Sequence, residues 1–174
     1  MPDMTRSLSR IVTVSAVFTA VGIILGYIES FIVIPVRIPG IRIGLANIVT
    51  VMTLYLCGPY VASAVLLARV CLSALLFGSP VSLSYSLAGA VSALSFMMIF
   101  KKLGFSVYGV SVIGAVVHNI AQIAVAGLLV GNSYVLYYIF ALIPVGVVSG
   151  MIVGTISNIL ISRLKKYMMR EEIT

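Results

Sequence analysis

Six runs of apolar residues, separated by glycine, proline or charged residues, organise the chain. They cover about residues 8–30, 43–56, 60–77, 81–100, 105–130 and 134–164. An apolar run of about 20 residues is long enough to cross a bilayer as a helix. The pattern therefore predicts an all-α, polytopic membrane protein with six transmembrane helices, in one membrane domain that occupies residues 1–174.

The breaks between the runs have the composition of helix ends and turns. Gly58-Pro59, Gly78-Ser79-Pro80 and Gly131-Asn132-Ser133 are turn sequences. Residues 33–42 contain two prolines and two arginines. Because irregular backbone is not tolerated in contact with lipid, we expect this segment at a membrane surface or in a protein-lined cavity.

Composition excludes an ordinary soluble domain. Of the 174 residues, 61% are hydrophobic and 9% are charged, whereas globular domains have roughly 45–50% and about 25%. The first apolar run is too long for a signal peptide and lacks a small-residue cleavage site, so we expect a retained helix. The two cysteines, Cys57 and Cys71, lie in apolar segments, which argues against a disulfide framework.

The formal net charge of +7 is explained by topology. Basic residues mark the cytoplasmic ends of membrane helices. With six helices, Arg37 and Arg42 fall on the outer side, and eight basic residues share the other: Arg6, Arg10, Lys101, Lys102, Arg163, Lys165, Lys166 and Arg170. We therefore expect both termini in the cytoplasm, a lipid bilayer as the surroundings, and no nucleic-acid partner.

Three polar residues fall on one face of the helix predicted at 105–130. His118 and Gln122 are four residues apart, Asn119 and Gln122 are three apart, and Gly114 lies one turn earlier. Polar side chains inside a membrane are costly and need a reason. They either line a binding site or join neighbouring helices by hydrogen bonds, and three on one face favour the site.

Other polar residues lie in the outer half of the predicted domain. Glu29 ends the first helix, Asn47 lies in the second, and Arg69 is near the middle of the third. If Glu29 pairs with Arg69, then Arg37 and Arg42 have no protein carboxylate to meet. They could bind an anionic ligand, since arginine holds carboxylate and phosphate by paired hydrogen bonds, or they could contact lipid headgroups.

Small residues recur at intervals of four in the first and last helices. Ala16 and Ala20 are followed by Gly22 and Gly26, and the last helix carries glycines at 146, 150 and 154. Such stripes let helices approach closely. We expect the glycines of the last helix to pack within the domain, whereas the stripe of the first helix could dock a partner.

The sequence lacks the motifs for nucleotide hydrolysis, for Mg²⁺ binding and for zinc binding. No P-loop sequence for nucleotide phosphates occurs. The four acidic residues, Asp3, Glu29, Glu171 and Glu172, cannot form a carboxylate cluster for Mg²⁺. One histidine and two separated cysteines do not match a zinc site. We therefore expect no enzyme activity, no cofactor and no metal.

Length, helix number, topology, Ala16 and Ala20 together resemble the S components of energy-coupling-factor (ECF) transporters. S components are the substrate-binding membrane subunits of prokaryotic vitamin importers. In that family an Ala-x-x-x-Ala motif in the first helix docks on a transmembrane T subunit, and ATPase subunits power uptake. The resemblance implies that Ala16 and Ala20 dock on a T subunit, in the plasma membrane of a prokaryote.

Two stretches are similar to a narrower family. Gly44-Leu45-Ala46-Asn47-Ile48-Val49 and His118-Asn119-Ile120-Ala121-Gln122 resemble Gx transporters, a family also called heptaprenyl diphosphate synthase component I. The two names imply different functions. Prenyltransferases of that kind use Asp-rich motifs, which this sequence lacks, so we favour transport, with an isoprenoid or quinone precursor retained as a possible ligand.

The resemblance implies a site for a small vitamin-like or anionic metabolite near the outer leaflet, under the connection between the first two helices. The substrate-binding candidates are Glu29, Arg37, Arg42, Asn47, Arg69, Tyr85, His118, Asn119 and Gln122. Two alternatives remain open. The chain could be a structural subunit of an isoprenoid or redox complex, or a proton-coupled carrier that depends on Glu29.

Overall fold

The computed structural model describes residues 4–31, 44–131 and 133–171, and these ranges are helical without a strand. The elements are α1 (Met4–Ser30), α2 (Leu45–Leu56), α3 (Pro59–Phe77), α4 (Pro80–Lys102), α5 (Val107–Val130), the short 3₁₀ helix η1 (Ser133–Tyr138) and α6 (Ile139–Glu171). The all-α prediction is confirmed. The last predicted helix is divided, because η1 precedes α6.

Five of the helices are long and apolar enough to cross a membrane, which fits a multi-pass membrane protein. The sixth predicted span, α2, is apolar but has only 12 residues, fewer than a helix needs to cross a bilayer alone. At 1.5 Å per residue it is about 18 Å long, and the hydrocarbon core of a bilayer is about 30 Å thick. The apolar run is real, but other helices rather than lipid surround it.

The helix ends follow from local sequence. Ser79 begins α4 through a capping box, because its side chain accepts from the backbone N–H of Ser82 and the Ser82 side chain accepts from that of Ser79. Pro80 then takes the first helical position, where a missing N–H costs nothing. Gly131 ends α5 with a φ of 66°, a left-handed conformation that glycine adopts without strain.

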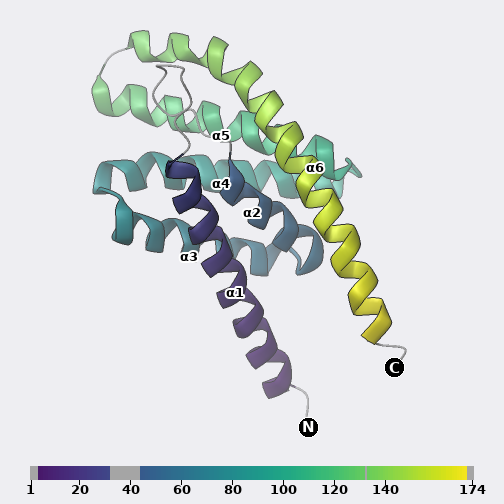
Figure 1. Cartoon of the computed structure of the whole chain (residues 1–174). Coiled ribbons are helices and arrows are strands. Elements are labelled where there is room, and N and C mark those ends of the chain that lie inside the picture. The colour runs from purple at the N-terminus through teal and green to yellow at the C-terminus, as the bar shows by residue number, and fades with distance from the viewer. Residues whose placement is uncertain (1–3, 32–43, 132, 172–174) are drawn as a thin grey trace.

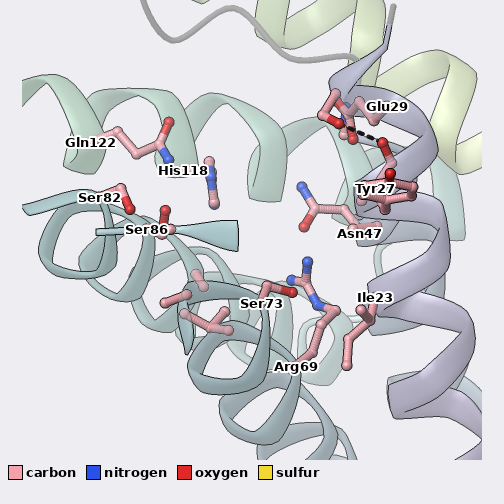
Figure 2. A pocket seen from close by; sticks show the side chains of 18 of the residues that line it. Ile23, Tyr27, Glu29, Asn47, Arg69, Ser73, Ser82, Ser86, His118 and Gln122 are labelled. Atoms are coloured by element: carbon pink, nitrogen blue, oxygen red, sulfur yellow. Dashed lines mark hydrogen bonds between the residues drawn. The ribbon is translucent and has the colours of Figure 1, made fainter. Parts of the chain in front are cut away.

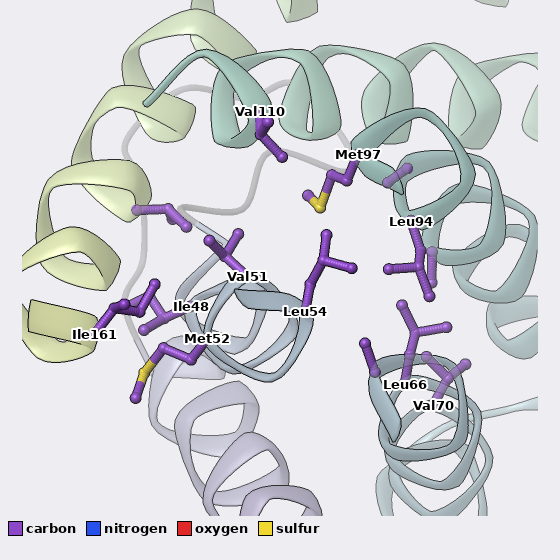
Figure 3. Packing of buried hydrophobic residues seen from close by; sticks show 14 residues of the cluster. Ile48, Val51, Met52, Leu54, Leu66, Val70, Leu94, Met97, Val110 and Ile161 are labelled. Carbon is purple, nitrogen blue, oxygen red and sulfur yellow. The ribbon is translucent and has the colours of Figure 1, made fainter. Parts of the chain in front are cut away.

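The core of the domain forms around α2. Eight of its 12 residues are buried. Figure 3 shows Ile48, Val51, Met52 and Leu54 between side chains of the surrounding helices. These neighbours include Leu66 and Val70 of α3, Leu94 and Met97 of α4, Val110 of α5 and Ile161 of α6. A helix that is buried in protein on most of its surface has the same apolar composition as a helix that faces lipid, so the sequence does not distinguish them.

Charged side chains from two other helices hold the ends of α2. The carboxylate of Glu29 on α1 accepts hydrogen bonds from the backbone N–H groups of Gly44 and Leu45, at 2.6 and 3.0 Å. At the other end, the Lys101 ammonium of α4 donates to the Leu54 carbonyl at 2.6 Å and lies 4.7 Å from the centre of the Tyr55 ring. Both charges match the helix dipole.

Three glycines bring α6 against α5. A Cβ atom at Gly146 would lie 3.2 Å from the Cα of Val116, and one at Gly150 would lie 2.6 Å from the Cα of Val112. Gly154 continues the stripe against Tyr108. The last helix therefore uses its glycines to pack within the domain, as expected. In Figure 1 the first turn of α1 and the last turns of α6 emerge on the same side.

Candidate functional site

A cavity of about 350 Å³ is lined by residues from all six α-helices. Its α1 lining comes only from residues 23–30, and its α6 lining is limited to Ser149 and Val153. The first turn of α1 and the last turns of α6 make no contribution. The cavity therefore lies in the half of the domain away from the two ends of the chain.

The structure brings six of the predicted substrate-binding residues to this cavity: Glu29, Asn47, Arg69, His118, Asn119 and Gln122. Figure 2 shows side chains from α1, α2, α3, α4 and α5 directed toward the same space. Residues far apart in the sequence thus meet in one place. Concave sites with a few convergent polar groups are the usual form of small-molecule sites.

His118 and Gln122 form the α5 wall and face α4. Gly89 of α4 makes their placement possible, because a Cβ there would lie 2.7 Å from Cγ of Gln122 and 3.1 Å from Cε1 of His118. Ser82 and Ser86 of α4 lie opposite them in Figure 2. The polar face predicted on this helix is therefore directed into the cavity.

Asn119 has a second contact, because its side-chain Nδ2 donates to the Leu142 carbonyl of α6 at 3.1 Å. The polar face was interpreted either as a binding site or as a set of hydrogen bonds between helices, and its residues differ in this respect. Asn119 joins two helices and also lines the cavity, whereas the Gln122 side chain makes no hydrogen bond to a described residue.

Arg69 reaches the cavity across a glycine of α1. A Cβ at Gly22 would lie 2.6 Å from the Arg69 Cδ, so only a residue without a side chain lets the arginine stem pass. The guanidinium points toward Asn47 and Ser73 in Figure 2. Gly22 therefore places the Arg69 charge in the cavity.

Glu29 is 7% exposed, and its two oxygens accept the backbone N–H groups of Gly44 and Leu45. The hydrogen bonds that Glu29 accepts thus come from the start of α2. Distance along the chain hid this contact, because residues 15 and 16 positions away supply the donors.

Serine hydroxyls contribute to the lining, and sequence reasoning missed them. Ser73, Ser86 and Ser111 line the cavity, and their hydroxyls make no hydrogen bond to any described residue. By contrast, Ser63 and Ser84 on the same α3 and α4 helices donate to carbonyls four residues back. The four-residue spacing of Ser82 and Ser86 was the available signal.

Tyr27 of α1 and Phe77 of α3 also line the cavity and were not predicted. Their rings stack with centroids 4.9 Å apart, and Phe31 meets Tyr27 edge-on at the same distance. Aromatic pairs of this kind join neighbouring elements with a preferred geometry. The stack closes the side of the cavity between α1 and α3.

Of the other three predicted residues, the structure describes only Tyr85. Tyr85 of α4 is not among its lining residues, whereas Ser82 and Ser86 are. Since successive helical residues are 100° apart, Tyr85 cannot share the direction of Ser86. Arg37 and Arg42 lie outside the described residues.

Ala16 and Ala20 are exposed on the outer surface of α1, away from the cavity. Among the described residues, no group of three His, Cys, Asp or Glu side chains could hold a metal ion. Cys57 and Cys71 are both free thiols.

One comparison with known proteins gave a match. The sequence profile of a family described as heptaprenyl diphosphate synthase component I matches residues 18–160. No curated protein and no solved structure matches the chain. The matched region includes every described residue that lines the cavity, although it covers only the second half of α1 and the first two thirds of α6. The chain therefore belongs to the heptaprenyl diphosphate synthase component I family.

Proposed function

We propose that this protein is a substrate-binding membrane subunit, the S component of an ECF-type importer. The cavity is the observation that carries the proposal. Six helices direct polar side chains into a space of about 350 Å³, within the size range of small-molecule sites. A purely structural subunit would have no need for cavity-lining polar groups that, like Ser86 and Gln122, make no hydrogen bond to a described residue.

The position of the cavity suits uptake from outside. It lies in the half of the domain away from the chain ends. Four exposed basic residues lie near the C-terminal ends of α4 and α6, away from the cavity: Lys102, Arg163, Lys165 and Lys166. Basic residues of this kind mark the cytoplasmic ends of membrane helices. In the plasma membrane of a prokaryote this arrangement directs the cavity outward and both termini inward.

The outer surface of α1 supplies the docking face in this proposal. Ala16 and Ala20 are exposed and four residues apart, so together they form a smooth strip on one helix face. Strips of small residues let a second helix approach closely in a membrane. A T subunit would dock here, and ATPase subunits would supply the energy that this chain is not proposed to generate.

The experiment is uptake by vesicles that contain the protein, a T subunit and the ATPase subunits. The substrate is first identified by mass spectrometry of whatever small molecule copurifies with the protein. Ala16→Leu and Ala20→Leu should retain binding of that molecule and lose ATP-driven uptake. Ala124→Leu is the matched control, because Ala124 is exposed on α5. Unchanged uptake in both α1 variants would refute the docking proposal.

A second candidate follows from the description of the family. Its members are named as a component of heptaprenyl diphosphate synthase, so this chain could anchor a soluble prenyltransferase without catalysis of its own. Native mass spectrometry discriminates the two functions. A stoichiometric soluble enzyme on the purified protein would favour the anchor, and a bound small metabolite would favour the importer subunit.

A further inference from the structure

Two walls of different character face each other across the cavity. One wall, from α2 and α3, carries Asn47, Arg69 and Ser73. The other, from α4 and α5, carries Ser86, His118 and Gln122. We refer to these as the arginine wall and the amide wall. A ligand that fills the space between them meets different chemistry at its two ends.

The arginine wall is suited to an oxyanion. A guanidinium presents five N–H donors in a planar fork, so it can hold a carboxylate or phosphate oxygen pair beside its other contacts. Ser73 follows Arg69 by four residues on α3, and its hydroxyl makes no hydrogen bond to a described residue. The Asn47 amide can add a further N–H donor from α2.

Glu29 does not offer an equivalent site for a cation. Its two carboxylate oxygens accept the N–H groups of Gly44 and Leu45, and the residue is only 7% exposed. Among the described lining residues, Arg69 is the only arginine or lysine. Among the described lining residues, the guanidinium of Arg69 is therefore the fixed charge with hydrogen-bond donors to offer a ligand, and that charge is positive.

The amide wall is suited to a neutral polar group. The Gln122 amide and the Ser86 hydroxyl each offer both a donor and an acceptor, and neither side chain bonds to a described residue. Carbonyl, hydroxyl and ring-nitrogen groups would all be satisfied there. An apolar group would leave the wall without partners, which is costly in a low-dielectric interior.

We propose that the cavity selects a small polar anion, with its oxyanion against Arg69 and Ser73 and its neutral hydrogen-bonding groups against Ser86 and Gln122. A long isoprenoid chain does not suit this space, because hydrogen-bonding side chains line two opposite walls of it. The inference rests on the proposed function only in taking the cavity as the ligand site. It names the substrate class of that site.

The test measures which charge the cavity admits. Ser73→Cys is made in a Cys57→Ala/Cys71→Ala background, and the protein is placed in lipid nanodiscs. Its thiol is reacted with anionic sulfonatoethyl methanethiosulfonate and with cationic trimethylammonioethyl methanethiosulfonate. Each rate is divided by that of the same reagent with mercaptoethanol. The anionic reagent should be preferred by at least about tenfold, since the reagents carry opposite charges beside one guanidinium.

Three variants control for position and for charge. Adding Arg69→Gln to Ser73→Cys should abolish the preference while leaving the thiol reactive. Cys71, left in place in a Cys57→Ala background, should resist both charged reagents. It is exposed on the spanning helix α3 but does not line the cavity, so lipid rather than water surrounds it. Ser86→Cys should react with both reagents and show a smaller preference, since it belongs to the amide wall.

Equal rates, a preference for the cationic reagent, or a Ser73→Cys thiol inert to both would each overturn the proposal. Protection of that thiol by farnesyl diphosphate would overturn it as well, because a prenyl ligand would then fill the cavity. The assay needs neither partner subunits nor uptake. Failed uptake with the anion preference intact would thus refute the transport function alone. Normal uptake without the anion preference would refute the substrate class alone.

Discussion

Removing the carboxylate of Glu29 should loosen α2 from its cavity-facing end. Its oxygens accept two backbone N–H groups at 2.6 and 3.0 Å, and the residue is 7% exposed. A buried donor left without an acceptor costs about 1–3 kcal/mol. Because Glu29→Ala also relieves the cost of burying a charge, we expect a net loss of about 3 kcal/mol, a large part of a typical stability of about 5–15 kcal/mol.

Glu29→Gln should lose less, about 1–2 kcal/mol, because its amide oxygen still accepts one N–H group while its NH₂ group faces the other. Ser30→Ala is the matched control. Its exposed hydroxyl bonds only to the Tyr27 carbonyl of the same helix, so the free energy of unfolding should change by less than about 0.5 kcal/mol.

The measurement combines unfolding by sodium dodecyl sulfate in mixed micelles with hydrogen exchange of the peptide that covers α2. Both Glu29 variants should speed hydrogen exchange in the first turn of α2, and Glu29→Ala should have a larger effect than Glu29→Gln. The last turn, held by Lys101, should respond less. Wild-type protection of the first turn in Glu29→Ala would refute the view that this carboxylate caps the helix.

Three further variants test other contacts. Lys101→Met should destabilise the protein by about 1–3 kcal/mol through the lost bond to the Leu54 carbonyl, measured by the same unfolding titration. Gly150→Ala should lower the thermal stability in detergent, because its Cβ would lie 2.6 Å from backbone, whereas Gly127→Ala meets only a side chain at 3.4 Å; equal melting temperatures would contradict close helix packing. Gly22→Ala should leave stability almost unchanged but displace the Arg69 stem, and an unaltered anion preference at Ser73→Cys would show that the stem has another path.

The apolar pattern predicted the helices well, because burial in lipid and in protein both require apolar residues. For the same reason it could not separate α2 from the spanning helices. The run from 43 to 56 has the hydropathy of a span, yet other helices surround it. Length was the better guide, since 12 residues do not cross a bilayer.

The site was predictable to the extent that its residues are rare in membranes. Arg69, His118 and Gln122 stand out in apolar helices, and all three line the cavity. Serines did not stand out, because a serine that bonds to its own helix is indistinguishable in sequence from one that faces a cavity. Gly22 and Gly89 were equally hidden, because their effect lies in the neighbours they admit.

The charged residues that hold the two ends of α2 are synthesised at different times, one before the helix and one after it. Glu29 precedes α2 in the chain, so its carboxylate is synthesised before the helix that it caps. Lys101 follows α2 by two further helices. The carbonyl of Leu54 must therefore wait for α4 before it gains its partner, and a chain truncated after α3 should expose α2 to degradation by membrane proteases. The contacts that hold the last turn of α2 are thus complete only once the fourth helix has been made.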